Sequence, residues 1–276
     1  MSETPPWLSI TRGQAPLIVS MPHTGSEIPV AKGASLVSLW LARKDADWWI
    51  DRLYDFEPSL GGSIVRTAIS RTVIDANRDP SGKSLYRGQN TTELCPTTTF
   101  DGEPLYRDGK APDGAEISTR RAEFFDPYHA AIATEIDRLR ERHPRVVLFD
   151  AHSIRSRIPR LFEGELPNFN IGTNSGASCA PELTESFEAV CARTKLSHVT
   201  NGRFKGGYTT RHYGAPDAGV HAIQLELAMR GYMDEPHVVS PDNWPTSFDR
   251  ERAGLMREAL SQILEACIAF ATTEKS

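Results

Sequence analysis

Short runs of apolar residues recur along the chain and predict buried β-strands. Residues 16–21 (PLIVSM) and 145–150 (RVVLFD) are almost wholly apolar, which is typical of strands that are covered on both faces of a sheet. Further short runs that favour strands cover residues 63–69, 72–76, 169–173 and 219–227. Each is short enough for a strand and too short for a buried helix.

Segments with helical spacing of apolar positions lie between these runs. They cover residues 34–57 in two pieces, 116–143 with a break near Pro127, 181–194 and 248–271. Pro181 stands where a first helical turn accepts proline. Because strands and helices alternate, the pattern predicts an α/β fold in which helices cover both sides of a sheet.

Residues 81–114 interrupt this alternation. They are rich in Gly, Thr, Pro and Asp and are too polar to form a core of their own. A loop of this length in a compact domain is often a lid or a binding loop. We find neither an internal repeat nor a linker, so we expect one domain over residues 1–276 with 81–114 as a loop excursion.

Composition narrows the class of protein. The 276 residues carry a net charge of −5, with 39% hydrophobic and 24% charged residues, which is ordinary for a globular protein and argues against a general nucleic-acid binder. No apolar run is long enough to span a bilayer, and the N-terminus lacks the pattern of a signal peptide. Four widely spaced cysteines favour reduced thiols in a cytoplasm. No feature indicates an oligomeric state.

Two histidines follow predicted strands. His23 comes after 16–21, His152 comes after 145–150, and Asp47 precedes a helical segment. Side chains at the carboxyl ends of neighbouring parallel strands meet at one edge of a sheet. Two imidazoles and one carboxylate form a common catalytic zinc set with one position open for water. Each residue could instead be a surface or capping residue, and Glu27 is a rival carboxylate.

The segment 201–233 combines a cationic loop with a strand that ends in a carboxylate. Arg203, Arg211 and His212 lie among glycines, and guanidinium groups suit planar anions such as carboxylates. Alternation places Glu226 on the strand face that also carries alanine and valine, where poor solvation raises a carboxyl pKa. Such a glutamate near a metal-bound water suits a general base. The alternative is a half-exposed strand whose polar face meets solvent.

Arg71, Asn77 and Arg78 lie within the motif SRTVIDANRDP (70–80). They could hold a substrate carboxylate, or they could belong to a solvated turn. Two arginines in one turn are weak evidence on their own.

Six motifs together resemble the N-formylglutamate amidohydrolase family. They are MPHTG (21–25), DADWWIDRLYDF (45–56), SRTVIDANRDP (70–80), LFDAHS (148–153), LPNFNIGTNSGASCAPEL (166–183) and the 33-residue block NGRFKGGYTTRHYGAPDAGVHAIQLELAMRGYM (201–233). The resemblance covers roughly residues 15 to 265 in the same order. It implies a three-layer α/β/α fold with a mixed sheet, similar to zinc carboxypeptidases and phosphorylase/hydrolase-like proteins.

The resemblance also implies an activity and a set of roles. The activity is the hydrolysis of N-formyl-L-glutamate to L-glutamate and formate, in one bacterial route of histidine degradation. The implied metal is one Zn²⁺ ion. The implied ligands are His23, Asp47 and His152, since Glu27 lies one residue too far along for the carboxypeptidase pattern. Glu226 matches the general base, and Asn77 with Arg78 resembles a pair that binds a terminal carboxylate.

The small dicarboxylate substrate requires two cationic sites. Arg78 and Arg71 are candidates for one site, and Arg203 and Arg211 for the other. Arg211 or His212 could instead support the oxyanion. Two other hypotheses stay open at this stage. One is a related zinc deacylase of another N-acyl amino acid, and the other is a non-catalytic anion-binding module.

Overall fold

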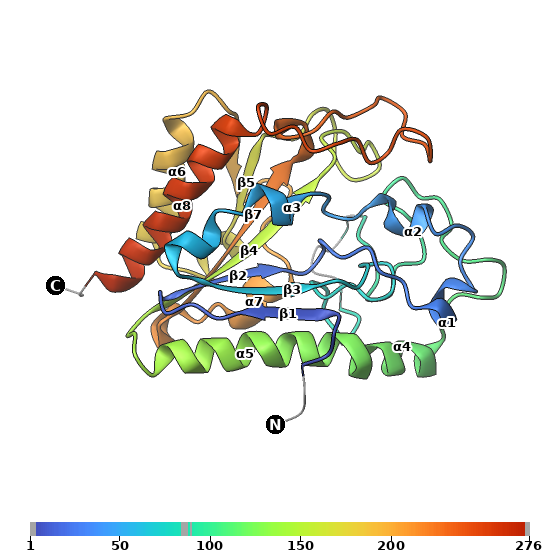
Figure 1. Ribbon diagram of the computed structural model, residues 1–276, viewed down its shortest axis with the longest axis horizontal. Coiled ribbons are helices and arrows are strands. Elements are labelled where there is room, and N and C mark those ends of the chain that lie inside the picture. The colour runs from blue at the N-terminus through green and yellow to red at the C-terminus, as the bar shows by residue number, and fades with distance from the viewer. Residues whose placement is uncertain (1–3, 84–87, 89, 274–276) are drawn as a thin grey trace.

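A seven-stranded mixed sheet forms the middle of the computed structural model, which describes residues 4–83, 88 and 90–273 (Figure 1). The strand order is β1-β3-β2-β4-β7-β5-β6. The strands are β1 (Leu8–Thr11), β2 (Leu17–Met21), β3 (Ser63–Thr67), β4 (Val146–Ile154), β5 (Phe169–Gly172), β6 (His198–Thr200) and β7 (Val220–Ala228). β3, β2, β4 and β7 are parallel, whereas β1 and β5 run antiparallel to β3 and β7. The predicted α/β class with a mixed sheet is confirmed.

Helices cover both faces of this sheet and complete three layers (Figure 1). The α-helices are α1 (Val30–Gly33), α2 (Leu41–Lys44), α3 (Ile50–Leu53), α4 (Gly114–Arg120), α5 (Asp126–Arg140), α6 (Pro181–Ala192), α7 (Tyr208–Tyr213) and α8 (Gly254–Thr272). α6 and α8 pack together on one face, while α5 and α7 contact the other. The predicted α/β/α layering is therefore confirmed.

The central strand β4 shows why its sequence is apolar. All nine of its residues are buried. Val147 and Phe149 belong to the core cluster that includes α6 and α8, whereas Val146 and Leu148 pack with α5 on the opposite face. Because successive side chains enter two different cores, a strand in this position needs apolar residues on both faces.

Two strand predictions are corrected by the structure. β4 continues to Ile154, so His152 lies inside the strand and not after its end. The predicted strand 72–76 is wrong, because these residues form turns and irregular backbone. Asp75, within that segment, accepts a hydrogen bond from the backbone N–H of Asn77 at 2.9 Å. This local bond favours a turn over the extended backbone that the apolar pattern suggested.

The helical predictions also need correction. Residues 34–57 do contain two helical pieces, α2 and α3, on either side of residues 45–49 as predicted, but each spans only four residues, and a 3₁₀ turn follows at 57–60. There is no break at Pro127, because this proline occupies the first turn of α5, where a missing N–H is tolerated. A π-helical turn at 121–125 joins α4 to α5. The last helix begins at Gly254 and not at 248, and β1, β6 and α7 were not predicted.

The excursion between β3 and α4 is irregular but well packed. In the described part of residues 81–113 only isolated bridges occur, and one of them joins Thr98 to Pro104. Phe100, Leu105 and Tyr106 are nevertheless buried and join clusters formed with other parts of the chain. This segment is too polar to form a core of its own, and these three buried side chains attach it to the rest of the protein.

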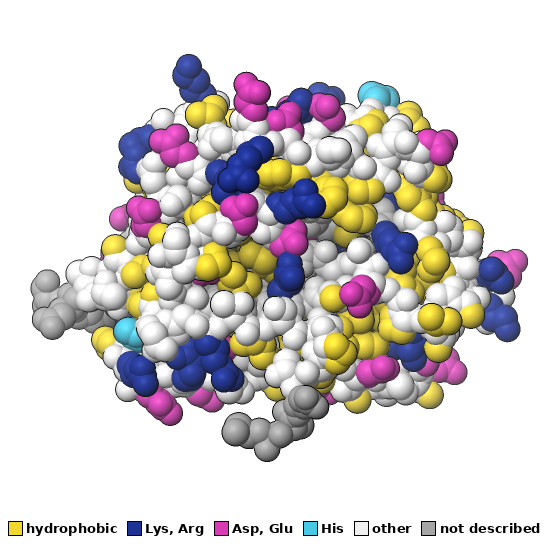
Figure 2. Space-filling model, in the orientation of Figure 1, with side chains coloured by type: hydrophobic (Ala, Val, Ile, Leu, Met, Phe, Trp, Pro, Cys, Tyr) yellow, Lys and Arg dark blue, Asp and Glu magenta, His cyan; other side chains and the backbone are white. Residues whose placement is uncertain are grey.

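The surface shown in Figure 2 mixes both signs of charge. Lys and Arg side chains are interspersed with Asp, Glu and hydrophobic side chains over this face. None of the helices in the described ranges has the length and the apolar character that crossing a membrane requires.

Glu57 gives a testable link between burial and stability. Its side chain is fully buried, and its carboxylate oxygens have no hydrogen-bond partner among the described residues. Burial raises the pKa of Glu57 from 4.5 to about 7. The folded state therefore holds a proton that the unfolded chain releases, so the stability contributed by the protonated carboxyl is lost as pH rises from about 4.5 to 7.

We expect Glu57→Gln to raise the free energy of unfolding at pH 8 by about 2–3 kcal/mol, because the neutral amide avoids the cost of a buried charge. At pH 4.5 the difference from wild type should nearly vanish. Denaturant titrations at both pH values test this, with the exposed Glu163→Gln as control. A pH-independent difference would show that ionisation of Glu57 does not limit stability.

Candidate active site

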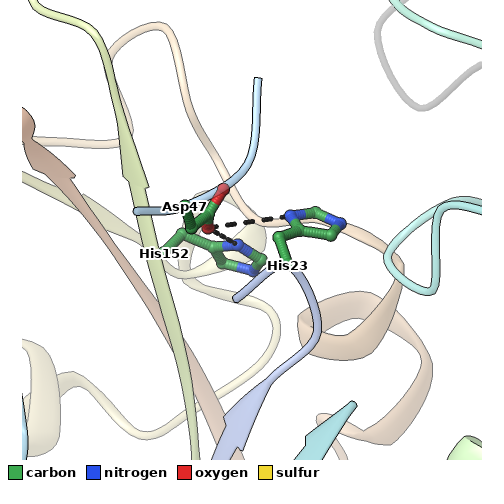
Figure 3. Close-up of side chains that lie close together, drawn as sticks. All are labelled: His23, Asp47 and His152. Atoms are coloured by element: carbon green, nitrogen blue, oxygen red, sulfur yellow. Dashed lines mark hydrogen bonds and ion pairs between the residues drawn. The ribbon is translucent and has the colours of Figure 1, made fainter. Parts of the chain in front are cut away.

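Three buried side chains from distant parts of the chain meet at the carboxyl ends of β2 and β4 (Figure 3). Asp47 Oδ2 lies 3.1 Å from His152 Nδ1 and 3.7 Å from His23 Nδ1. The three potential ligand atoms lie within 4.8 Å of one another. All three side chains point toward one another (Figure 3). One ion could therefore contact all three.

The sheet accounts for the position of the two histidines. β2 and β4 are adjacent and parallel, with Ser20 opposite Asp150. Three residues beyond Ser20, past Pro22, the chain reaches His23, and two residues beyond Asp150 it reaches His152. Both imidazoles therefore stand at nearly the same level, and their ring centroids are 4.8 Å apart.

Asp47 enters the site from the turn between α2 and α3. Its N–H donates to the carbonyl of His23 at 2.9 Å, and its Oδ2 accepts from the N–H of Ser153 at 3.0 Å. Trp49, two residues on, has φ = 64°, which is unusual for a bulky residue. Its indole N–H is tied to the carbonyl of Thr246 at 2.9 Å. The N-cap of α3 is Trp49, so Asp47 does not cap that helix. Glu27, the other carboxylate considered as a ligand, is exposed.

A second carboxylate holds the far nitrogen of each imidazole. Asp75 Oδ1 lies 2.6 Å from His23 Nε2, and Asp150 Oδ2 lies 3.0 Å from His152 Nε2. Such partners orient histidines that bind metals and leave the Nδ1 atoms facing the site. Buried His23 Nδ1 has no hydrogen-bond partner in the described part of the chain.

The charges of this cluster favour a cation. Burial opposes ionisation of Asp47 and Asp75, yet neighbouring cationic groups hold the pKa of both carboxyls below the usual value. Burial also opposes a charged His152, but the carboxylates of Asp150 and Asp47 raise its pKa well above the usual value. Carboxylates that favour a proton at this position also favour a metal ion. The two nitrogens and one carboxylate oxygen thus fit a divalent metal, and match the donors that zinc accepts.

Glu226 faces this cluster from the neighbouring strand. In the register of β4 and β7 it lies opposite His152. Its side chain is buried, and burial raises the pKa of Glu226 to about 7. Arg71 and Asp150 also influence this carboxyl electrostatically. A carboxyl group whose pKa lies near neutral pH can both accept and donate a proton.

Arg71 is buried next to the same carboxylates. Its Nη2 donates to Asp75 Oδ2 at 2.7 Å, and its Nη1 lies 3.5 Å from Asp47 Oδ1. The guanidinium carbon lies 4.8 Å from the ring centroid of Phe100. Arg71 thus directly contacts Asp47, one of the three residues of the candidate metal cluster.

Asn77 links the cluster to α7. Its Nδ2 donates to Asp150 Oδ2 at 3.0 Å, and its Oδ1 accepts from the N–H of Thr209 at 2.8 Å. Gly207 packs against this amide so closely that a Cβ there would lie 2.3 Å from Asn77 Nδ2. Part of the glycine content of the loop before α7 is therefore explained by close approach to Asn77.

One pocket contains most of the residues singled out from the sequence. It is lined by His23, Arg71, Asn77, Arg78, Asn90, Thr91, Thr92, Phe100, His152, Ile154, Leu161, Arg203, Phe204, Gly207, Gln224 and Glu226. Arg78 donates to the carbonyl and hydroxyl of Thr92, and Arg203 donates to the carbonyls of Leu161 and Asn90. Both arginines therefore connect the pocket to the surrounding loops.

The structure does not bring Arg211 and His212 to this pocket. Both lie on α7, where Arg211 Nε donates to the carbonyl of Gly206 at 2.8 Å. His212 is exposed and stacks on Tyr208 at a centroid distance of 4.8 Å. The α7 helix, which the sequence did not predict, carries both residues, and neither is among the residues that line the pocket.

Residues that the sequence analysis did not select also build the site. Asp150 is a histidine partner, Phe100 and Gln224 line the pocket, and Gln224 Oε1 accepts from the N–H of Gly207 at 2.7 Å. The spacing of a carboxylate two residues before His152 on one strand is a usable signal. Phe100 lies in a polar stretch that carried no comparable signal.

Comparison with known proteins agrees with this architecture. Residues 15–233 match the family model for N-formylglutamate amidohydrolase. The chain is 48% identical over 264 residues to an N-formylglutamate deformylase of Pseudomonas aeruginosa, covering 95% of this chain and 96% of the relative. It is 47% identical to an N-formylglutamate deformylase of Pseudomonas putida, with the same coverage. A crystal structure of N-formylglutamate amidohydrolase from Ralstonia eutropha has a TM-score of 0.75, with 23% identity and coverage of 96% and 97%.

An α/β/α fold with a buried carboxyl beside a candidate metal cluster suits a hydrolytic enzyme, and the comparisons identify a hydrolase that acts on an amide. The chain belongs to the N-formylglutamate amidohydrolase family. The resemblance inferred from the six sequence motifs is therefore confirmed, and a non-catalytic module is set aside.

Proposed function

We propose that this protein hydrolyses N-formyl-L-glutamate to L-glutamate and formate with one Zn²⁺ ion held by His23, Asp47 and His152. The observation that carries the proposal is the position of Glu226, a buried carboxyl opposite His152 with a pKa of about 7, in a pocket that arginines also line. The names of the relatives from the two Pseudomonas species support the choice of substrate.

The chemistry divides between the ion and the protein. When bound, Zn²⁺ supplies a Lewis acid that polarises the formyl carbonyl and makes a water molecule more acidic. Glu226 accepts a proton from the attacking water as the new C–O bond forms. It then delivers this proton to the departing nitrogen as the C–N bond breaks. One water is consumed, and formate and the free amine of glutamate result.

The buried cation beside the cluster has a role in this scheme. Arg71 lies next to Asp47 and Asp75 and acts on Glu226 electrostatically, so its guanidinium is close to the reacting carbonyl. A fixed cation at that point stabilises the negative charge that develops on the oxygen. We assign this role to Arg71 in place of Arg211 or His212, which lie outside the pocket.

The substrate carboxylates require the remaining cations of the pocket. Arg78 and Arg203 both line it and come from different loops, which suits two carboxylates on one flexible molecule. Asn77 instead acts through His152, since its Nδ2 lies 2.8 Å from His152 Nε2 and its amide is also engaged by Asp150 and by Thr209. The proposal also includes a cytoplasmic enzyme in histidine degradation, on the strength of the cysteine pattern and the family resemblance.

The direct test is the release of formate from N-formyl-L-glutamate, measured beside acetate and succinate release from N-acetyl- and N-succinyl-L-glutamate. We expect formate release to be fastest and to stop when a chelator removes the metal. Faster release of a longer acyl group would identify a related deacylase. Formate release that a chelator leaves intact, from protein without stoichiometric metal, would exclude the zinc mechanism.

Arg78 provides a prediction on binding. Replacing it with alanine removes one charged partner of a substrate carboxylate, so we expect KM to rise by about 10- to 100-fold with a smaller change in kcat. Steady-state kinetics with N-formyl-L-glutamate measure both constants. The control is Arg193→Ala, because Arg193 is exposed and bonds Gln262 on the face of α6 and α8. An unchanged KM would remove Arg78 from the substrate site.

A further inference from the structure

One wall of the pocket is apolar, although the proposed substrate is a dianion. Phe100, Ile154, Leu161 and Phe204 line the pocket and belong to a single hydrophobic cluster, either as its buried members or packed against it. An apolar wall gains nothing from a carboxylate. It must therefore face the parts of the substrate that carry no charge, which are the acyl group and the side-chain methylenes.

The two ends of this wall contact different arginines. Phe100 lies over Arg71, with 4.8 Å between the ring centroid and the guanidinium carbon. Phe204 lies under Arg203 at 5.3 Å, and Leu161 accepts a hydrogen bond from Arg203 at 2.8 Å. Because Arg71 lies against Asp47, the Phe100 end of the wall is the end nearest the reacting carbonyl. The Arg203 end is where a substrate carboxylate binds in the proposed function.

Charged side chains hold the backbone at Phe100 and at the next residue in place. Its backbone N–H donates to Asp45 Oδ2 at 2.7 Å. The next residue, Asp101, accepts from buried Lys44 at 2.6 Å and from Arg155 at 2.7 Å. These contacts join the turn that carries Phe100 to α2 and to the end of β4. A ring held in this way cannot retreat to admit a larger group without breaking ion pairs whose cationic partners, Lys44 and Arg155, are buried.

We propose that Phe100 limits the size of the acyl group, with the acyl subsite lying between its ring and the cluster of His23, Asp47 and His152. The inference rests on the proposed function and deepens it by assigning acyl selectivity to one residue. A formyl group places a hydrogen where acetyl places a methyl and propionyl an ethyl. Against a wall that does not relax, one added methyl lowers kcat/KM by about 10- to 200-fold.

The test compares kcat/KM for N-formyl-, N-acetyl- and N-propionyl-L-glutamate in wild type, Phe100→Leu and Phe100→Ala. We expect the acetyl-to-formyl ratio to rise by about 10-fold or more in Phe100→Ala and less in Phe100→Leu. Leu161→Ala, at the other end of the same wall, should lower all three values by one common factor. Phe100→Leu keeps most of the apolar volume and serves if the alanine variant does not fold.

A purely structural role for Phe100 would give a different set of kcat/KM values. If Phe100 only supports Arg71, its variants lower kcat/KM for the three substrates equally, and an unchanged ratio overturns the proposal.

Binding provides a second measurement that does not depend on turnover. In Glu226→Gln protein, adding Phe100→Ala should tighten the binding of N-acetyl-L-glutamate, measured calorimetrically, relative to N-formyl-L-glutamate. An unchanged relative affinity contradicts the proposal. Failure of wild type to release formate, by contrast, contradicts the proposed function and leaves the binding comparison intact.

Discussion

The Glu226→Gln variant should keep its metal and hydrolyse N-formyl-L-glutamate about 10²- to 10⁴-fold more slowly than wild type, since that is the usual contribution of a general acid–base group. Glutamine has nearly the same shape as glutamate and fits the same buried position on β7, opposite His152. It cannot accept a proton from water. The loss should therefore appear in kcat, with KM nearly unchanged.

Metal content and kinetics must be measured on the same preparation. Mass spectrometry of the metal per chain should give equal values for wild type and Glu226→Gln, because Glu226 does not belong to the His23, Asp47 and His152 group. Glu163→Gln, an exposed substitution of the same kind, should leave both quantities at wild-type values. Turnover at the wild-type rate in Glu226→Gln would remove this residue from the mechanism.

The His152→Ala variant should lose both the metal and the activity. It removes one of three donors and also leaves Asp47 and Asp150 without their shared partner. Asp150→Asn keeps the donor but weakens its orientation, so metal affinity should fall by about 10- to 100-fold, and in His152→Ala it should fall further. Competition with a coloured chelator measures each affinity.

A matched histidine gives the control for this series. His198 is exposed on the edge strand β6, so His198→Ala should bind metal as wild type does. If His152→Ala kept wild-type metal affinity, the ion would have to be held elsewhere and the proposed ligand set would be wrong.

The sequence was most informative where periodicity and topology agreed. Residues 16–21 and 145–150 are apolar because helices cover both faces of the sheet, and the strands that they form, β2 and β4, are parallel neighbours. The proximity of His23 and His152 follows from this arrangement. Asp47 was harder to place, because a turn sets its position through contacts with His23 and Ser153.

Local patterns were misleading where tertiary contacts decide the backbone. The apolar residues around 72–76 suggested a strand, but Asp75 is engaged by His23, Arg71 and the backbone of Asn77. The glycine-rich segment near Arg211 looked like a cationic loop throughout, yet residues 208–213 form α7, and Arg211 is not among the residues that line the pocket. No periodicity marks contacts of this kind, since each depends on groups far away in the chain.

The continuation of β4 past His152 determines how local unfolding and loss of a bound metal ion are related. Its last residues, including Ser153 and Ile154, remain paired with β7. Amide hydrogens in such a central strand exchange with solvent mainly through global unfolding and not through fraying. Bound metal should therefore slow exchange along the whole of β4 by the factor 1 + [metal]/Kd. A chelator, in turn, should draw the ion from an intact sheet, at a rate independent of the unfolding rate.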